Sequence, residues 1–224
     1  SVTGPTGAGK TSFINLVAGS SLEVGNSLRS CTSGVQTVQC IVAGEQVTFI
    51  DTPGFDDTYK SQADILKDIA DFLEQTYEGG RKLTGVIYMH RISDVRVGGI
   101  ARENFRLFKK ICGRGAMKNV VIVTTMWDEV PEEVGARREQ ELASKSLFFK
   151  DALDDGAKMH RHCGQITTAQ TSMSPFLRFL PETLQLQREL VDEMRVLPET
   201  TAGDELQRSL DEQADAHRRQ MLDL

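Results

Sequence analysis

A glycine-rich stretch near the start of the chain has the composition of a phosphate-binding site. Residues 4–11 read GPTGAGKT and fit the pattern GxxxxGK[ST]. In this pattern the glycines let backbone N–H groups converge on phosphate oxygens, and the N-terminus of the following helix favours the negative charge. Lys10 is expected to reach the β- and γ-phosphates, and the Thr11 hydroxyl to bind Mg²⁺. The predicted nucleotide contacts in this stretch are Gly4, Pro5, Thr6, Gly7, Ala8, Gly9, Lys10, Thr11 and Ser12.

A second motif, DTPG at residues 51–54, ends an apolar stretch. Asp51 is expected to hold Mg²⁺ through a water, and the Gly54 N–H to bond the γ-phosphate. In isolation these residues could also be an ordinary strand followed by a Pro-Gly turn. The spacing after residues 4–11, with a hairpin between them, favours the magnesium interpretation.

The polar loop SCTSGVQ, residues 30–36, lies between these two motifs. A nucleotide-dependent loop at this place would supply a hydroxyl to Mg²⁺. Thr32 is the preferred ligand, with Ser30 and Ser33 as alternatives, although a plain polar loop has the same composition. The predicted catalytic residues are Lys10, Thr32 and Gly54, and the predicted metal ligands are Thr11, Thr32 and Asp51.

Together with VVIVTTMWD at residues 120–128, these motifs resemble the boxes of G-domain GTPases. The GxTGxGK[ST] form is similar to the septin-like branch, which contains septins, the immunity-associated (GIMAP) GTPases and the chloroplast import GTPases. The stretch GVIYMHRISD, residues 85–94, is similar to fungal G-domain proteins. Over about residues 1–180, the resemblance implies a Ras-like, three-layer α/β fold, with helices on both faces of a mostly parallel sheet. It also implies Mg²⁺ and GTP or GDP as ligands, and a homodimer formed across the nucleotide face.

The base-reading box departs from the family form Asn/Thr-Lys-x-Asp at one position. The resemblance implies that the Asp128 carboxylate accepts hydrogen bonds from guanine and that Thr125 takes the first position. Met126 stands where the lysine is usual, so an apolar surface for the ring remains while the ammonium is lost. Guanine is therefore the predicted base, with weakened affinity and with ATP as an alternative ligand. Residues 127–128 could also be merely a strand end and a helix cap.

Two further expectations concern less clearly marked parts of the site. The last base-contacting box should follow a weak strand at residues 156–162, so His162 and Cys163 are its candidates. Phe55 stands where Ras-type GTPases keep a glutamine that orients the attacking water. Slow hydrolysis is therefore expected, unless a partner or another side chain helps. His90, Arg91 and Arg96 are candidates for that help, and solvated loop charges are the alternative.

Composition describes an ordinary globular chain of 224 residues with 39% hydrophobic residues and a net charge of −6. The negative charge gives no reason to expect nucleic-acid binding. The four cysteines form no CxxC pair, and no apolar run approaches the length of a membrane span, so a cytoplasmic location is expected. Since residues 1–3 are too short for the strand that must precede the loop, we also expect residues before Ser1.

The elements that must position these groups alternate between strands and helices. Strands are predicted at residues 35–42, 46–51, 83–90, 119–125 and 156–162, the first two forming a hairpin, and helices at 61–77, 102–111 and 132–150. Residues 181–224 form a C-terminal helical extension with two apolar stripes. It either packs on the domain or serves as an arm for a protein partner.

These observations favour a dimerising guanine-nucleotide switch that hydrolyses GTP slowly with Mg²⁺. One alternative is an NTPase of relaxed base specificity that hydrolyses both ATP and GTP. The other is an assembly scaffold that binds nucleotide and hardly turns it over.

Overall fold

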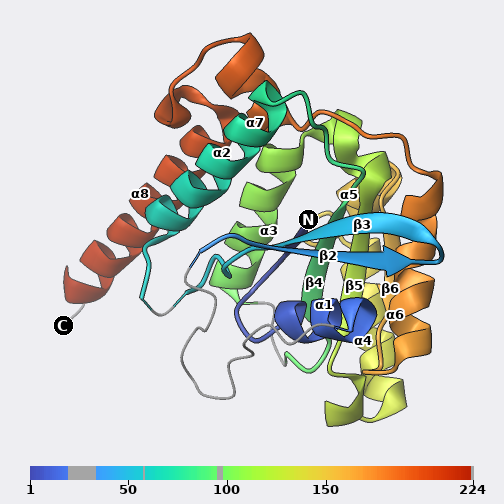
Figure 1. The fold of residues 1–224 in the computed structure, drawn as a ribbon. Helices are drawn as coiled ribbons and strands as arrows, with labels where there is room; N and C mark the ends of the chain where they lie inside the picture. Colours follow the sequence, from blue (N-terminus) through green and yellow to red (C-terminus); the bar gives the residue numbers. More distant parts are fainter. Residues whose placement is uncertain (20–33, 58, 95–97, 223–224) are drawn as a thin grey trace.

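The computed structural model describes residues 1–19, 34–57, 59–94 and 98–222. Its centre is a six-stranded sheet with the order β2-β3-β1-β4-β5-β6, in which β2 and β3 form an antiparallel hairpin and the remaining pairs are parallel (Figure 1). The predicted α/β fold and the hairpin are confirmed. The strands are β1 (Val2–Thr3), β2 (Gln36–Val42), β3 (Glu45–Asp51), β4 (Val86–Arg91), β5 (Val120–Thr125) and β6 (Lys158–Arg161).

Helices cover both faces of this sheet (Figure 1). They are α1 (Lys10–Ala18), α2 (Gln62–Glu78), α3 (Gly99–Cys112), α4 (Glu132–Ser144), α5 (Lys150–Asp154), α6 (Ile166–Met173), α7 (Gln185–Gln187) and α8 (Thr201–Leu222). Strand β5 explains the layering, because its alternate residues enter two separate cores. Val120 and Ile122 pack with α2 and α3, whereas Val121 and Val123 pack with α1 and α6. Burial on both faces accounts for the four consecutive apolar residues that begin this strand.

The helix predicted over residues 132–150 is wrong as a single element. Helix α4 ends at Ser144 because Lys145 adopts an extended backbone, and α5 begins only at Lys150. Between them the Phe149 N–H donates to the Leu142 carbonyl at 2.9 Å. Phe149 is thereby buried against Tyr88 and Phe105, so core packing interrupts the helix.

Other predicted boundaries shift by a few residues. Helix α2 begins after Ser61, whose hydroxyl accepts a hydrogen bond from the Asp64 N–H. Helix α3 starts three residues earlier than predicted, at Gly99. Strand β4 starts at Val86 rather than Leu83, because Leu83 instead forms an isolated antiparallel bridge to Glu182.

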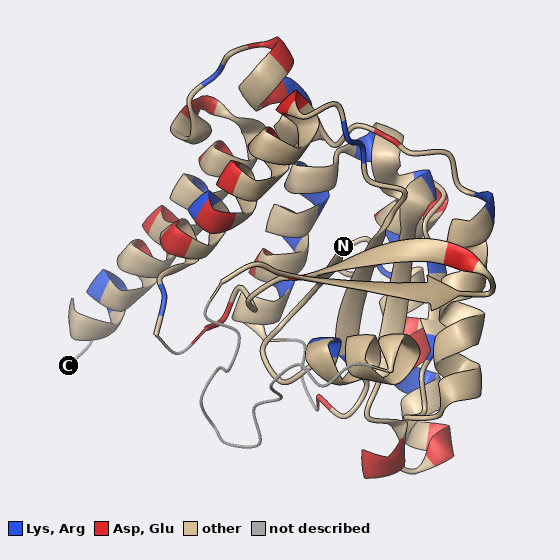
Figure 2. Ribbon diagram, viewed as in Figure 1, with Lys and Arg blue, Asp and Glu red and all other residues tan. Residues whose placement is uncertain are grey.

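The C-terminal extension packs on α2 and α3. Leu186, Leu190 and Leu206 enter the core that α2 and α3 share with the sheet. Helix α8 lies along α3, where Arg106 pairs with Glu205 at 3.6 Å, and Figure 2 shows charges of both signs along α8. The second half of α8 is exposed, including Met221 at 73%. Within the described residues, the first half of α8 therefore packs Leu206 on the domain, whereas Leu210 and Met194 of the two predicted stripes are 40% and 85% exposed.

The buried side chain of Glu189 connects α7 with the start of α8 through hydrogen bonds. Its side chain is 1% exposed and accepts hydrogen bonds from the Thr201 N–H at 3.0 Å and from the Thr201 hydroxyl at 3.2 Å. Gln185 donates to its other carboxylate oxygen at 3.0 Å. The first N–H groups of a helix lack partners within the helix, so this buried carboxylate caps α8.

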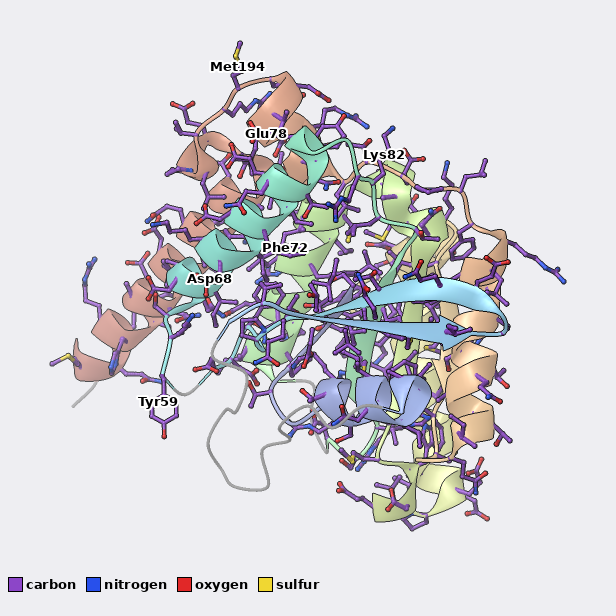
Figure 3. All side chains as sticks on the ribbon, in the orientation of Figure 1. Tyr59, Asp68, Phe72, Glu78, Lys82 and Met194 are labelled. Atoms are coloured by element: carbon purple, nitrogen blue, oxygen red, sulfur yellow. The ribbon has the colours of Figure 1, made fainter. Side chains whose placement is uncertain are left out.

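The molecular surface carries isolated apolar side chains. Tyr59 and Met194 project outward and are 64% and 85% exposed, whereas Phe72 points from α2 toward the sheet (Figure 3). In the part of the chain described, no helix has the length and apolar character needed to cross a membrane.

Candidate nucleotide-binding site

The loop between β1 and α1 has a backbone that requires glycine. Gly4, Gly7 and Gly9 have φ angles of 135°, 75° and 87°, which side chains rarely adopt. At Gly4 a Cβ would also lie 2.3 Å from the Met89 carbonyl oxygen, so this loop packs directly on β4. The loop leads directly into the N-terminus of α1. The backbone N–H groups and the dipole at a helix N-terminus favour binding of an anion such as phosphate.

Lys10 lies inside this loop and is 7% exposed. Its ammonium donates to the carbonyl oxygens of Gly4 and Pro5 at 3.0 and 2.9 Å. Burial lowers the pKa of Lys10 to about 8, against the opposing effect of the carboxylates of Asp51 and Asp56. A buried cation with two exchangeable carbonyl partners can transfer its hydrogen bonds to phosphate oxygens.

Thr11 and Asp51 meet at the ends of α1 and β3. The Thr11 hydroxyl donates to Asp51 Oδ2 at 2.7 Å, and Oδ1 of Asp51 is buried without a hydrogen-bond partner among the described residues. Burial raises the pKa of Asp51, while the Thr11 hydroxyl and Lys10 oppose that rise. A half-buried hydroxyl and an unsatisfied carboxylate oxygen fit Mg²⁺, which prefers oxygen ligands. The third predicted ligand, Thr32, lies outside the described residues, as do Ser30 and Ser33.

The segment after β3 closes against the loop. Gly54 is buried, and a Cβ there would lie 2.4 Å from the Thr6 hydroxyl oxygen. Next to it, the Thr6 N–H donates to Asp56 Oδ1 at 2.5 Å. Sequence reasoning missed Asp56, although its place two residues after Gly54 was a usable signal.

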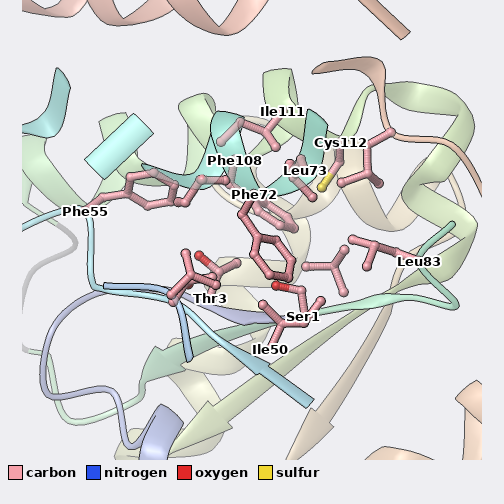
Figure 4. A pocket seen from close by; sticks show the side chains of 15 residues that line it. Ser1, Thr3, Ile50, Phe55, Phe72, Leu73, Leu83, Phe108, Ile111 and Cys112 are labelled. Carbon is pink, nitrogen blue, oxygen red and sulfur yellow. The ribbon is translucent and has the colours of Figure 1, made fainter. Parts of the chain in front are cut away.

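Phe55 points the opposite way, into the core. It is 1% exposed and lines a small apolar pocket with Phe108 and Ile111 (Figure 4). The residues that line this pocket include none of the loop 4–11, so the pocket is part of the core and not the phosphate site. Phe55 therefore neither contacts the phosphate region nor positions a water there.

The three residues predicted to assist hydrolysis differ in where they lie relative to the phosphate loop. Arg91 Nη1 lies 3.1 Å from the place of a Cβ on Gly7, so its guanidinium runs along the phosphate loop, where it pairs with Asp94 at 3.1 Å. The expectation that His90 faces the phosphate edge is wrong. His90 is 2% exposed and packs edge-on against Phe149, and burial lowers its pKa to about 4. Arg96 lies outside the described residues.

The base-reading box adjoins the phosphate loop. Thr125 is buried and its hydroxyl donates to the Ala8 carbonyl at 3.0 Å, which ties the end of β5 to the loop. Met126 has a φ of 58°, and its Cε lies 3.8 Å from the place of a Cβ on Gly9. Asp128 follows in an exposed helical turn. The thioether of Met126 therefore lies beside the loop, and the Asp128 carboxylate is accessible to a ligand.

Trp127 is the residue of this box that faces inward. Its Nε1 donates to the Thr124 carbonyl at 3.2 Å and to the Thr124 hydroxyl at 3.1 Å. The Arg161 guanidinium lies 4.1 Å above the indole, and Glu139 holds it there. Hydrogen bonds from Arg161 to Glu139 and Glu132 raise the pKa of Arg161 further above its usual range. Sequence reasoning missed Arg161, whose contact depends on the parallel pairing of β5 with β6.

The candidates for the last box are both brought to this edge, with different orientations. The His162 N–H donates to the Thr124 carbonyl at 2.8 Å, and its ring packs on Phe13 and contacts the Thr168 hydroxyl. His162 is thus committed to the sheet and cannot offer its N–H to a base. Cys163 is exposed, and its N–H makes a longer 3.3 Å bond to Thr168.

These geometries, on a mostly parallel sheet with helices on both faces, define a P-loop G domain. The chain belongs to the AIG1 family, which its residues 2–147 match. It is 30% identical over 127 residues to GTP-binding protein A of Dictyostelium discoideum, a match that covers 57% of this chain and 27% of that protein. It is 29% identical over 124 residues to translocase of chloroplast 90 of Arabidopsis thaliana, covering 55% of this chain and 16% of that protein. The matches span less than a third of either relative.

Solved structures with the same fold include two that were determined with nucleotides. Toc33 from Arabidopsis thaliana, crystallised with Mg²⁺ and GMPPNP, superposes with a TM-score of 0.58 at 18% identity, covering 79% of this chain and 82% of that one. Era from Aquifex aeolicus, bound to GDP·AlF4⁻, gives a TM-score of 0.61 at 16% identity, covering 81% and 56%. At these identities the likeness establishes the fold.

Proposed function

We propose that this chain binds GTP and GDP together with Mg²⁺ and hydrolyses GTP slowly. The observation that carries the proposal is the pair formed by the Thr11 hydroxyl and the Asp51 carboxylate, 2.7 Å apart beside the buried ammonium of Lys10. The accessible Asp128 carboxylate at the same edge of the sheet supports guanine as the base, because carboxylates accept hydrogen bonds but do not donate them when ionised. The bound ligands of Toc33 and Era support the same nucleotide class.

Slow turnover is proposed because Phe55 is buried in the core. The residue at this position therefore does not orient the attacking water, as the glutamine of Ras-type GTPases does. Besides Lys10, Arg91 is a described cation beside Gly7 that could stabilise charge on a transferring phosphate. We further propose that a homodimer across the nucleotide face completes the site. Dimerisation is important for the GTPase activity of the chloroplast translocon components Toc33 and Toc159, and this chain shares the fold of Toc33.

A second candidate is an NTPase that also hydrolyses ATP. It is favoured by Met126, which offers the base a thioether but no ammonium. The buried Phe55 favours a third candidate, an assembly scaffold with little turnover. The exposed second half of α8 supports a protein partner for the C-terminal extension in any of these cases. Within the family, the stretch GVIYMHRISD supports a position near the septin-like and fungal G-domain proteins.

The test is to purify the chain, denature it and identify the nucleotide that is released, and then to measure GTP and ATP hydrolysis with and without Mg²⁺. Released guanine nucleotide and Mg²⁺-dependent GTP hydrolysis are expected. Lys10→Ala should remove most triphosphate affinity with the fold intact, since Lys10 contacts loop carbonyls and not the apolar core. Undiminished nucleotide binding by that variant would overturn the proposal.

A further inference from the structure

A carboxylate of the chain occupies part of the phosphate loop. Asp56 Oδ1 accepts the Thr6 N–H at 2.5 Å, and Thr6 belongs to the loop whose N–H groups are expected to hold phosphate. Hydrogen bonds to ionised acceptors are stronger than those between neutral groups. A carboxylate oxygen therefore lies where a phosphate oxygen is expected, and it makes the kind of contact that a phosphate would make.

The position of Thr6 indicates which phosphate is affected. Gly54, whose N–H is expected to bond the γ-phosphate, lies against Thr6 with no space for a Cβ between them. The other end of the loop, at Gly9, leads directly into α1 and lies beside Met126 of the base-reading box. The Thr6 N–H is therefore at the γ-phosphate end of the loop, and the α1 N-terminus remains available to the inner phosphates.

Asp56 is held in this place by its neighbours. Phe55 is anchored in the core at 1% exposure, and the Asp57 N–H donates to the Gly54 carbonyl at 3.1 Å, which closes a turn over residues 54–57. Asp56 itself is half-buried. A half-buried carboxylate within an anchored turn differs from a surface side chain, which moves freely into solvent.

Charge makes this contact and a γ-phosphate mutually exclusive. Asp56 lies close enough to Lys10 for the two charges to interact. A γ-phosphate on the same N–H would bring a second anion into contact with this carboxylate, and like charges at that distance repel. A triphosphate must displace Asp56 before it occupies the site, whereas a diphosphate need not.

We propose that Asp56 is a specificity-determining residue that competes with the γ-phosphate for the Thr6 N–H. The resting site then accepts a nucleoside diphosphate more readily than a triphosphate. The inference rests on the proposed binding of guanine nucleotides and adds to it a reason why the site resists the triphosphate.

The experiment is calorimetric titration of GDP and of the non-hydrolysable analogue GMPPNP, both with Mg²⁺, into the parent chain and its variants. Asp56→Asn removes the charge, and Asp56→Ala also removes the acceptor. Both should tighten GMPPNP by about tenfold, which corresponds to about 1.4 kcal/mol. The GDP affinity of both variants should stay within about twofold of the parent's GDP affinity. Asp57→Asn is the matched control, because it removes the same charge one residue further along.

Circular dichroism of all variants without nucleotide checks that they fold. If one of the two Asp56 variants folds poorly, the other one still tests the inference. Equal tightening of GDP and GMPPNP, or the same selective effect from Asp57→Asn, overturns the inference, because a diffuse field would then explain the result. Weaker GMPPNP binding by Asp56→Ala also overturns it. If the parent binds GDP but the ratio of GMPPNP affinity to GDP affinity is unchanged in the Asp56 variants, the inference is overturned and the proposed function stands. A parent that binds neither nucleotide overturns both.

Discussion

The Lys10 ammonium is buried on two carbonyl oxygens, and burial lowers its pKa to about 8. In the nucleotide-free protein this group therefore loses its proton as the pH rises through about 8, well below the ordinary range of a lysine. A bound phosphate favours the charged form and raises the pKa again. Nucleotide binding should consequently take up a proton near pH 8, and affinity should fall as the pH rises above that value.

This is measured by calorimetric titration of GDP at pH 7 and pH 8.5 in two buffers with different ionisation enthalpies. The apparent binding enthalpy should depend on the buffer at pH 8.5. Lys10→Arg is the control, since a guanidinium stays protonated throughout this range and the buffer dependence should vanish. A parent chain whose binding enthalpy is the same in both buffers would show that Lys10 is already fully charged.

Met126 and Asp128 should have separable roles in base recognition. Met126 lies beside Gly9 of the phosphate loop, so Met126→Lys should place an ammonium there and tighten GTP by up to about tenfold, or 1.4 kcal/mol, without changing base preference. Asp128→Asn should weaken GTP and relatively favour xanthosine triphosphate, whose 2-oxo group can accept from the asparagine amide. Competition titrations of GTP, ATP and xanthosine triphosphate distinguish these effects. Equal binding of ATP and GTP by the parent, unchanged in Asp128→Asn, would mean that the carboxylate does not contact the base.

At the scale of elements, the motif residues were predictable because each motif carries its own spacing. Thr11 and Asp51 were expected to share a metal ion, and their side chains meet. The direction of side chains outside the motifs depended on packing between distant segments. The His90 side chain packs edge-on against Phe149 inside the core. The Arg161 guanidinium lies over Trp127 because strand β6 pairs with strand β5.

The same limit explains the interrupted helix and the extension. Helical periodicity continues through residues 132–150, but burying Phe149 stabilises a break that no local pattern reveals. The extension was predicted as helical from its apolar stripes, whereas the cap that Glu189 provides for α8 joins residues twelve positions apart. Buried charged side chains of this kind are rare, and their partners cannot be read from spacing.

Glu189 should be required for the stability of the extension. Glu189→Ala leaves the Thr201 N–H and hydroxyl at the start of α8 without their buried acceptor, which should cost about 1–3 kcal/mol. For a chain of this size the melting temperature should fall by about 2–4 °C for each kcal/mol. Glu193→Ala is the matched control, since Glu193 is exposed and its ion pair with Arg195 should contribute under about 1 kcal/mol. Thermal unfolding followed by circular dichroism measures both, and equal losses would contradict the capping role.

At the scale of the whole molecule, the site lacks a described group that would orient the attacking water. If a second copy supplies it, the specific GTPase activity should rise with protein concentration. GMPPNP with Mg²⁺ should also shift the mass in light scattering from monomer to dimer, while GDP should do so less. Activity strictly proportional to enzyme, with a monomer in every nucleotide state, would rule out the dimer.

The contact between Trp127 and Arg161 gives the molecule an intrinsic optical probe. Trp127 is the chain's one tryptophan, it is 7% exposed, and its neighbours on either side are Met126 and Asp128 of the base-reading box. Fluorescence excited in the indole therefore reports from a single known place, and a cation 4.1 Å above the ring makes the emission sensitive to small shifts. Nucleotide binding should change the emission without any label, whereas Arg161→Ala should alter the starting spectrum. Rapid mixing of unlabelled protein with nucleotide would thus follow the rate at which this site fills.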